Sequence, residues 1–519
     1  MKTNKKHRTG IKIYAVIAMS LLVLLTVRLT YVAVFCSDEL NAAATMLHER
    51  ERAVKAPRGR IITADGTVMA DNKTVCTVSV IHSQIEDEEY VIDILSRELD
   101  MSEDKVRSYV EKISSMERIK SNVSKETGDR IREYNIPGVK VDEDSKRTYP
   151  YNELASKVMG FTGADNQGIV GLEVKYDSVL AGVNGEILTP ADAAGIELDE
   201  YEEKRKEPIP GDDLYISLDY SIQSYCMQAA MKTYEAKQAK SVSIIVMNPQ
   251  TGELLAMVNY PEYNLNDPYI LNYDVSDEKE KMDLLNAMWR NGVINDTYEP
   301  GSTFKVITAT AGLSCGAVRL SDTYCCGGST VVGSRTIRCH KTTGHGTQTF
   351  AETLMNSCNP AFITWGLRTG VDNFLTYMDR LGLMSVTGVD LPGEASTIMH
   401  KKENIKELEL ATMSFGQSFQ ITPLQLMRAI SCVINGGTLI TPHFGVRTID
   451  SQGNINTLEY ESVSGVITPE VSNTMKMLLK SVVSEGGGGK CYIEGYSIGG
   501  KTATSQKLPR SEHKYIASR

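Results

Sequence analysis

Aromatic residues are scarce in this chain of 519 residues, and it has no excess of positive charge. Aromatic side chains make up 7% of the sequence, which argues against a surface that stacks single-stranded bases. Asp and Glu outnumber Lys and Arg by 65 to 55, which gives a net charge of -10. A general nucleic-acid-binding protein needs a basic face to replace counterions, so no nucleic-acid partner is expected.

Cysteine is also sparse, and internal repeats at solenoid periods are missing. Ten cysteines in 519 residues do not make a disulfide scaffold. The composition, 41% hydrophobic and 23% charged, is sufficient for buried cores and excludes a disordered or low-complexity chain. The length suggests about two to four domains.

The sequence has a single long apolar run, at residues 13–35, which carries one charge, Arg28. At about 1.5 Å per residue, a helix of this length spans about 35 Å and can cross a bilayer. A cleaved signal peptide is the alternative, but the run is too long and lacks a clear small-residue cleavage site. Lysines and arginines before the run predict a cytoplasmic tail at residues 1–12 and an extracytoplasmic bulk. We therefore expect a single-pass cell-membrane protein.

The extracytoplasmic part divides near a charged, proline-containing stretch at residues 204–211. Before it, short strands and glycine turns alternate, and residues 84–135 have a charged, helical pattern. We expect one domain at 36–211 and a second at 212–519.

The second domain begins with a strand, a helix at residues 221–237 and a hairpin at 241–261. Helices and loops follow, and strands are predicted again at 494–507 and 513–518. Strands at both ends with helices between predict an α+β domain whose sheet is closed by sequence-distant strands.

The first candidate for chemistry is Ser302, three residues before Lys305. Pro300 and Gly301 break the chain, so Ser302 is expected in the first turn of a helix with Lys305 on the same face. A lysine amine takes the proton of a serine hydroxyl when burial or nearby positive charge lowers its pKa. The alternative is a helix-capping serine and a solvated lysine.

The second candidate is the pair Ser357 and Asn359, before Pro360, which is well placed to open a helix. Two residues apart in extended backbone, their side chains are expected to point the same way. The alternative is helix capping by Asn359.

The third candidate is the segment Gly499–Ser505. Its small residues allow close approach of another element, and Lys501, Thr502 and Thr504 are suited to holding a carboxylate. The alternative is a glycine-rich turn with a surface lysine.

In this order, S-x-x-K, S-x-N and K-T-small resemble the signature of serine β-lactamases and penicillin-binding proteins. The chain resembles a class B penicillin-binding protein, a monofunctional peptidoglycan D,D-transpeptidase with a membrane anchor, of the stage V sporulation protein D or division type. The resemblance extends over nearly the whole chain. It includes the segments at 58–66, 147–150, 171–173, 387–394 and 414–417. It implies an elongated pedestal, related to dimerisation domains, at 36–211 and a transpeptidase domain at 212–519.

The resemblance also implies roles. Ser302 would form an acyl-enzyme with D-Ala-D-Ala stem peptides or β-lactams, with Lys305 as base and Ser357 as proton relay. Asn359 would hold the peptide amide, and Lys501 and Thr502 the terminal carboxylate. The backbone N–H groups of Ser302 and Thr504 would form the oxyanion hole. No cofactor and no metal is implied, and a polytopic glycosyltransferase is the expected protein partner.

Two departures from the family pattern stand out. The third motif ends in Ala503 where the family usually has glycine. The sequence ends soon after Lys501, whereas relatives continue through further sheet and a terminal helix. We therefore expect a C-terminally truncated transpeptidase domain, poorly folded or weakly active in this form.

Cys325, Cys326 and Cys339 lie on a predicted hairpin on the outer face, where disulfides persist. The favoured hypothesis is a disulfide bond from Cys339 to Cys325 or Cys326. A second hypothesis is that these cysteines bind zinc together with His340 and His345, although the spacing fits no common zinc pattern. The third hypothesis is that all three cysteines are free thiols.

Three other functions use the same features. A β-lactam-sensing receptor usually has several membrane helices, and a β-lactamase needs an activated water for which no distal glutamate is identifiable. A non-catalytic scaffold of the wall-synthesis complex would need only the anchor and the pedestal. Serine-type transpeptidation in cell-wall synthesis, during division or sporulation, is the expected function.

Overall fold

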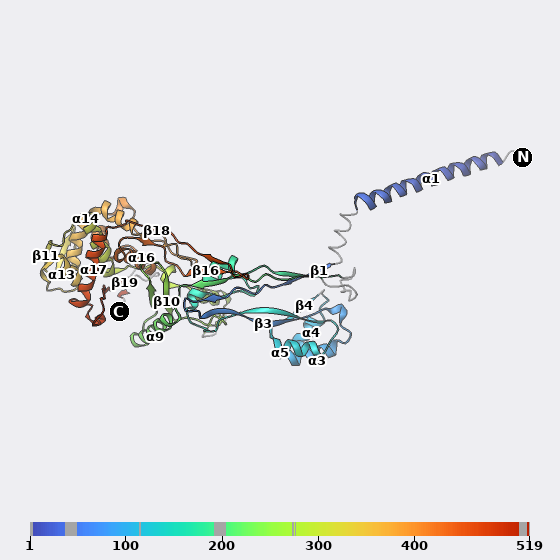
Figure 1. Ribbon diagram of the computed structural model, residues 1–519, viewed down its shortest axis with the longest axis horizontal. Coiled ribbons are helices and arrows are strands. Elements are labelled where there is room, and N and C mark those ends of the chain that lie inside the picture. Colours follow the sequence, from blue (N-terminus) through green and yellow to red (C-terminus); the bar gives the residue numbers. More distant parts are fainter. Residues whose placement is uncertain are drawn as a thin grey trace. The chain divides into compact units, whose positions relative to one another are not determined.

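The computed structural model describes residues 4–36, 49–113, 116–190, 204–271, 275, 277–507 and 516–517. The chain divides into two compact units, each built from three sequence segments (Figure 1). Unit 1 comprises Met1–Pro57, Lys73–Lys146 and Val183–Ile209, and unit 2 comprises Arg58–Asn72, Arg147–Gly182 and Pro210–Arg519. The expected domain boundary at residue 211 stays a prediction.

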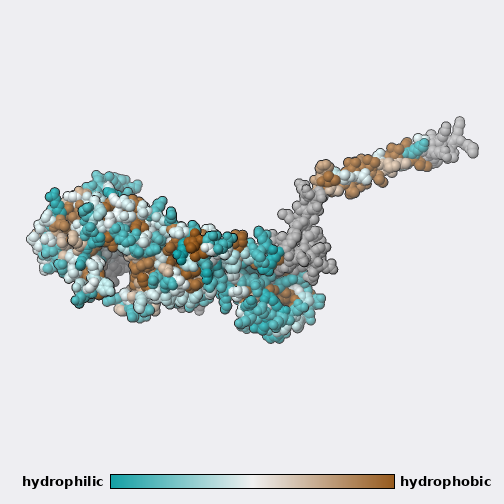
Figure 2. All heavy atoms as spheres, in the orientation of Figure 1, coloured by the Kyte–Doolittle hydropathy of each residue, from teal (hydrophilic) through white to brown (hydrophobic). Residues whose placement is uncertain are grey.

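Helix α1 (Asn4–Phe35) contains the apolar run and begins well before it. Its segment Thr9–Phe35 is long and apolar enough to span a membrane, with a mean hydropathy of 2.2, and its side chains are exposed. Figure 2 shows apolar side chains along this helix. The lysines and arginines before residue 13 extend the helix because they are good helix formers. One N-terminal apolar helix fits a single-pass membrane anchor.

Beyond helix α1, the described part of unit 1 combines strands with helices α3, α4 and α5. One sheet has the antiparallel order β1 (Glu49–Val54), β6 (Gly185–Pro190), β7 (Lys204–Lys206). The second region consists of part of β3 (Val68–Val80), β4 (Glu117–Ser124), β5 (Val139–Thr148), η1 (His82–Gln84), α3 (Glu88–Leu99), α4 (Glu103–Val110) and α5 (Lys125–Glu133). The helices form because apolar residues recur at helical spacing, and in α3 these residues are buried in the local core. The charged helical pattern predicted at 84–135 is thus three helices and a strand.

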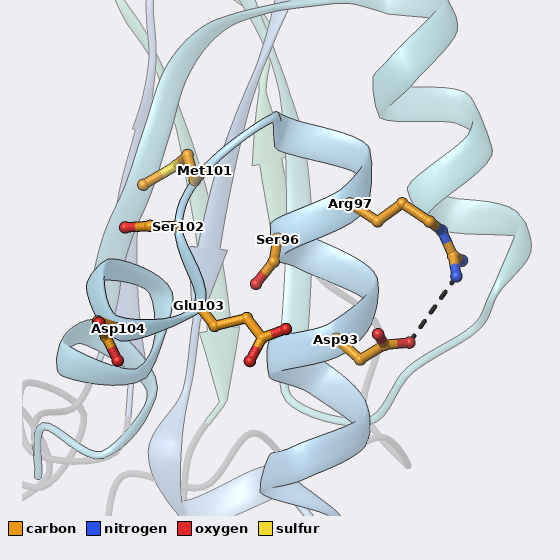
Figure 3. A pocket seen from close by; sticks show the side chains of 7 residues that line it. All are labelled: Asp93, Ser96, Arg97, Met101, Ser102, Glu103 and Asp104. Atoms are coloured by element: carbon orange, nitrogen blue, oxygen red, sulfur yellow. Dashed lines mark ion pairs between the residues drawn. The ribbon is translucent and has the colours of Figure 1, made fainter.

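A surface pocket lies beside α3 and the start of α4 (Figure 3). Asp93 and Arg97 form an exposed ion pair of 3.7 Å at one side, and Ser102 and Asp104 line the other. None of the three candidate motifs at 302–305, 357–359 and 499–505 contributes a residue to its lining.

A buried ion network organises unit 2. Glu173 is fully buried and accepts hydrogen bonds from Arg58 Nε at 2.6 Å and from Arg147 Nε at 2.7 Å. The Tyr149 hydroxyl donates to the same carboxylate at 3.2 Å. Arg147 also donates to the carbonyl oxygen of Gly59 at 2.8 Å. Three of the sequence segments that carry the family resemblance therefore meet at one carboxylate.

The larger strand assemblies of unit 2 are a sheet and a hairpin, and its shorter strands form separate pairs. The sheet follows the order β17 (Ile455–Thr457), β16 (Gly445–Ile449), β8 (Asp213–Ile216), β2 (Ile61–Ile62), then β3. The predicted hairpin is present as β9 (Val242–Met247) and β10 (Leu254–Tyr260), with α9 (Tyr220–Lys237) packed on it. Among the described residues, no third strand joins the hairpin.

The main core of unit 2 is helical. Trp365, Phe304, Phe350 and Phe362 are fully buried in it, so α12 and α14 pack closely. The helices of unit 2 are α6 (Ser156–Met159), α7 (Gly171–Lys175), α8 (Asp177–Leu180), α10 (Glu278–Trp289), α11 (Gly292–Asn295), η2 (Gly301–Phe304), α12 (Lys305–Ser314), α13 (Phe350–Met355), α14 (Asn359–Arg380), η3 (Lys402–Asn404), α15 (Glu407–Met413), α16 (Pro423–Ile434), α17 (Pro469–Ser484) and η4 (Gly489–Cys491). Its short strands are β11 (Thr323–Cys326), β12 (Ser329–Val332), β13 (Arg335–Arg338), β14 (Gly346–Thr349), β15 (Leu439–Ile440), β18 (Ser462–Val463), β19 (Gln506–Lys507) and β20 (Ile516–Ala517).

The predicted strand at 494–507 is wrong for most of its length. Only Gln506–Lys507 is a strand, and it pairs with Ile516–Ala517. Most of the strand predicted at 513–518 lies outside the described residues. The segment before β19 is instead held by helix α17, because Gly500 N–H donates to Leu479 O at 3.1 Å. A side chain at Gly499 would lie 3.0 Å from Leu479 Cβ, so glycine permits this approach. The α+β class itself is confirmed.

Replacing Glu173 by glutamine removes the carboxylate partner of the buried Arg147 guanidinium and leaves the buried Arg58 guanidinium with Asp177 alone, 2.8 Å away. Removing one partner of a buried pair costs about 3–5 kcal/mol, so we expect the free energy of unfolding to fall by about that amount. Urea unfolding of the full chain in detergent measures it. Asp372→Asn, which breaks an exposed ion pair with Lys402, is the control. Equal losses in the two variants would contradict the role given to Glu173.

Candidate active site

Ser302 lies in a short 3-10 turn, η2, that leads directly into helix α12. Gly301 has a φ of +57°, and its N–H donates to Gly416 O at 2.9 Å. Pro300, not Ser302, precedes the turn, so Ser302 is not its capping residue. The Ser302 side chain is half-buried, and its hydroxyl has no hydrogen-bond partner among the described residues. This leaves the oxygen available to react.

Lys305 is fully buried, so the solvated-lysine alternative does not apply. Its amine donates to Ser357 O at 2.7 Å, to Ser357 Oγ at 3.1 Å and to Asn359 Oδ1 at 2.7 Å. These three acceptors match the three protons of an ammonium group. Burial, followed by the nearby charge of Lys501, lowers the pKa of Lys305 to about 7. A substantial fraction of the amine is then neutral near physiological pH.

Ser357 and Asn359 lie side by side for a different reason from the one predicted. The backbone at Ser357 is left-handed, with a φ of +50°, and not extended. Cys358 precedes α14, and Asn359 is the first residue of that helix. The oxygen of Asn359 accepts from Lys305, so the capping alternative is wrong. One amine thus fixes both side chains of the second motif.

Lys501 reaches the second motif from the irregular segment beside α17. Its amine donates to Ser357 Oγ at 3.0 Å and to Thr502 O at 2.9 Å. Burial lowers the pKa of Lys501 to about 8. The Ser357 hydroxyl therefore accepts from two amines, Lys305 and Lys501, and this geometry suits a proton relay between them.

The third motif also approaches the start of the Ser302 turn. A side chain at Gly301 would lie 3.1 Å from Thr504 O and 3.2 Å from Ser505 Cβ. Thr502, Ala503 and Thr504 are exposed. The structure thus brings Ser302, Lys305, Ser357, Asn359 and Lys501 into one region of unit 2, with Thr504 next to Gly301.

Sequence reasoning gave no role to two residues that support the Ser302 turn. Glu299 is buried, its Oε1 accepts from Ser418 N–H at 2.9 Å, and burial raises its pKa. Gly416 has a φ of +86°, and a side chain there would lie 2.1 Å from Gly301 O. In the sequence, the glycine between Phe415 and Gln417 was the one sign that the backbone comes close to another segment here.

The segment 387–394 has a structural role. Asp390 is buried and accepts from Phe444 N–H at 2.8 Å, Gly445 N–H at 2.7 Å and the Tyr176 hydroxyl at 2.6 Å. Burial, reinforced by the Asp390 charge, raises the pKa of Tyr176 far above its ordinary value, so it stays a hydrogen-bond donor.

The cysteine bridge expected at Cys325, Cys326 and Cys339 is absent, and all three are free thiols. Cys325 is exposed whereas Cys326 is buried, because successive residues of strand β11 face opposite sides. Cys339, which directly follows β13, is also buried. Cys326 and Cys339 lie instead with His345 and Cys358 in a cluster able to hold a metal ion.

Two family matches cover most of the chain. Residues 242–518 match the penicillin binding protein transpeptidase domain, and residues 53–216 match the penicillin-binding protein dimerisation domain.

Curated relatives agree with these matches. Stage V sporulation protein D of Bacillus subtilis is 34% identical over 99% of this chain and 78% of its own length. Peptidoglycan D,D-transpeptidase MrdA of Acinetobacter baumannii is 28% identical over 93% of this chain and 76% of its own length. Peptidoglycan D,D-transpeptidase FtsI of Escherichia coli is 29% identical over 76% of this chain and 63% of its own length.

Solved structures share the fold. The crystal structure of penicillin binding protein 2X from Streptococcus thermophilus aligns with a TM-score of 0.73 at 22% identity. The alignment covers 91% of this chain and 73% of that one. A peptidoglycan synthetase from Bifidobacterium adolescentis aligns with a TM-score of 0.70 at 19% identity, over 90% of this chain and 88% of the other.

Replacing Gly416 by alanine tests the packing under the Ser302 turn. The left-handed φ costs about 1–2 kcal/mol, and the clash with Gly301 adds about 1–3 kcal/mol. Gly453→Ala is a matched control, because Gly453 has a φ of +85° and no neighbour within 4 Å of the new methyl group. We expect urea unfolding to show a larger loss for Gly416→Ala. If the two losses are equal, the contact does not support the turn.

Proposed function

This chain belongs to the class B penicillin-binding proteins, and we propose that its Ser302 site cross-links peptidoglycan stem peptides through an acyl-enzyme. The observation that carries the proposal is the fully buried Lys305 amine, hydrogen bonded to Ser357 and Asn359 and placed one turn after Ser302. Its pKa of about 7 suits a base that works near neutral pH.

Acylation begins at Ser302. When Lys305 loses one of its three protons, the amine gains a lone pair that accepts the proton of the Ser302 hydroxyl. The serine oxygen then attacks the carbonyl of the penultimate D-Ala and forms an ester. The bond to the terminal D-Ala breaks, and its nitrogen leaves with a proton relayed through Ser357. With a β-lactam, the ring amide opens in the same way and the product stays attached.

Deacylation completes the cross-link. An amine from a second stem peptide attacks the ester carbonyl, a new amide bond forms, and Ser302 recovers its proton. The backbone N–H groups of Ser302 and Thr504 stabilise the oxyanion in both steps. The closeness of Thr504 to Gly301 supports this pairing.

Recognition of the donor peptide falls to the second and third motifs. Lys501 carries the positive charge for the terminal carboxylate, and the hydroxyls of Thr502 and Thr504 are exposed and free to assist. Because Asn359 uses its oxygen to hold Lys305, its amide nitrogen is the group that contacts the substrate peptide. Ala503 is exposed, so its methyl group does not point into packed structure.

The setting of the enzyme follows from its N-terminus. The basic residues before the apolar segment of α1 support a cytoplasmic tail and an extracytoplasmic catalytic unit. Such an enzyme needs a supply of glycan strands, so a polytopic glycosyltransferase is the expected protein partner. The 34% identity to a stage V sporulation protein favours wall synthesis during sporulation over division.

Labelling with a fluorescent penicillin tests the nucleophile. We expect the full chain in detergent to be labelled covalently and Ser302→Ala to show no label. Ser314→Ala, in the last turn of the helix α12 that follows Ser302, is the control and keeps the label. A label that is stable in a chase supports a transpeptidase, and rapid loss indicates a β-lactamase. Absence of label from a folded wild-type chain would favour a scaffold.

The two lysines predict a bell-shaped pH dependence of acylation. Lys305 must be neutral, so the second-order rate constant rises as the pH passes its pKa of about 7. Lys501 must be protonated to hold the carboxylate, so the rate falls as the pH passes about 8. Stopped-flow measurement of penicillin acylation from pH 5.5 to about 10 records both limbs.

Lys501→Arg separates the two limbs. Arginine keeps its charge throughout this pH range, so the falling limb disappears while the rising limb stays near pH 7. A loss of the rising limb in this variant would contradict the assignment of Lys305 as the base.

A further inference from the structure

Four metal-ligating side chains that the acyl-transfer mechanism does not use converge in unit 2. We propose that Cys326, Cys339, His345 and Cys358 bind a structural zinc ion that holds the second motif in place. Their ligand atoms all lie within 4.8 Å of one another. No ion takes part in the acyl transfer proposed at Ser302, so the role proposed for this ion is structural.

The spacing of the four groups fits a tetrahedral centre. With Zn–S of about 2.3 Å and Zn–N of about 2.0 Å, tetrahedral geometry separates sulfur from nitrogen by about 3.5 Å and two sulfurs by about 3.8 Å. Cys339 Sγ lies 3.6 Å from His345 Nδ1. Three thiolates and one imidazole are a donor set that favours zinc among the divalent ions.

The backbone around the cluster is folded to bring these groups together. Strands β11 and β14 pair with Cys326 opposite Gly346, which places Cys326 beside His345. The N–H of Cys339, directly after β13, donates to Gly328 O at 2.9 Å. A side chain at Gly344 would lie 2.3 Å from Cys326 O, so glycine is needed for the turn that presents His345.

Burial distinguishes the cluster from exposed cysteines. Cys326 and Cys339 are each 2% exposed, Cys358 is 0% exposed, and His345 is half-buried at the edge. Cysteine alone in a core behaves as a small apolar residue. An imidazole nitrogen directed at three buried sulfurs is not explained by apolar packing, whereas metal coordination explains all four groups. Four protein ligands leave no open position, which indicates a structural and not a hydrolytic ion.

One ligand of the proposed zinc site is adjacent in sequence to the residues proposed for catalysis. Cys358 lies between Ser357 and Asn359, the two residues that hold the Lys305 amine. Zinc therefore ties the β11–β14 region to the start of α14, and acts as a positioning element for the second motif. The compact left-handed backbone at Ser357 is the part that this tie restrains.

Metal analysis of the full chain tests the site. The protein is purified in detergent without a histidine tag and with reductant, and its zinc content is measured by mass spectrometry. We expect about one zinc ion per chain, and at least about tenfold weaker zinc binding in Cys339→Ser and His345→Ala. The controls are Cys325→Ser and His340→Ala, neighbours outside the cluster, which keep the zinc. His345→Cys, which offers a fourth thiolate, restores binding.

A second readout guards against variants that fail to fold. Cobalt added to the metal-free wild-type chain gives thiolate charge-transfer bands, and these bands are absent when the three cysteine thiols are alkylated first. Ser302→Ala keeps both zinc and cobalt bands although it takes no penicillin, so the two proposals fail separately. A wild-type chain without zinc binding, or a disulfide between two of the four positions, would overturn the inference.

Discussion

The catalytic unit depends on one constraint, the burial of the Lys305 amine. An amine removed from water must be given hydrogen-bond acceptors, and here the acceptors are two oxygens of Ser357 and the side-chain oxygen of Asn359. The same burial lowers the pKa of the amine, which suits it to the proposed role of base. The hydrogen bonds that fix Ser357 and Asn359 and the lowered pKa of Lys305 thus both result from the burial of one amine.

Other parts of unit 2 fix the positions of the Ser302 turn and of the segment that carries Lys501. The contact of Gly416 with Gly301 fixes the turn before α12, and helix α17 holds the glycines that precede Lys501. Away from the site, Glu173 gathers Arg58, Arg147 and Tyr149 from three distant segments. These hydrogen bonds join distant segments through buried polar groups, which restricts the backbone to few alternatives.

Much of the local structure was predictable because it depends on neighbouring residues. The apolar helix at the N-terminus, the hairpin of β9 and β10, and the turn at Pro300 and Gly301 all follow from short-range pattern. The irregular backbone found in place of the strand expected at 494–507 was not predictable in this way. We expected a strand, but the glycines of the segment pack against α17, and a strand needs a partner that local sequence does not specify.

The candidate site shows the same division. The identities and order of Ser302, Lys305, Ser357, Asn359 and Lys501 could be read from the sequence, because reactive groups are recognised by residue type and short spacing. The left-handed backbone at Ser357 and the support from Glu299 could not.

What the sequence alone determined was the family, the membrane-spanning segment and the candidate reactive residues. The tertiary structure decided which groups meet: it brought two lysines to one serine hydroxyl, left three expected bridge cysteines as thiols, and placed Cys358 with Cys326, Cys339 and His345. The reason is physical. Short-range patterns record the preferences of neighbouring residues, whereas a buried charge or a four-ligand cluster exists only after distant segments have excluded water between them.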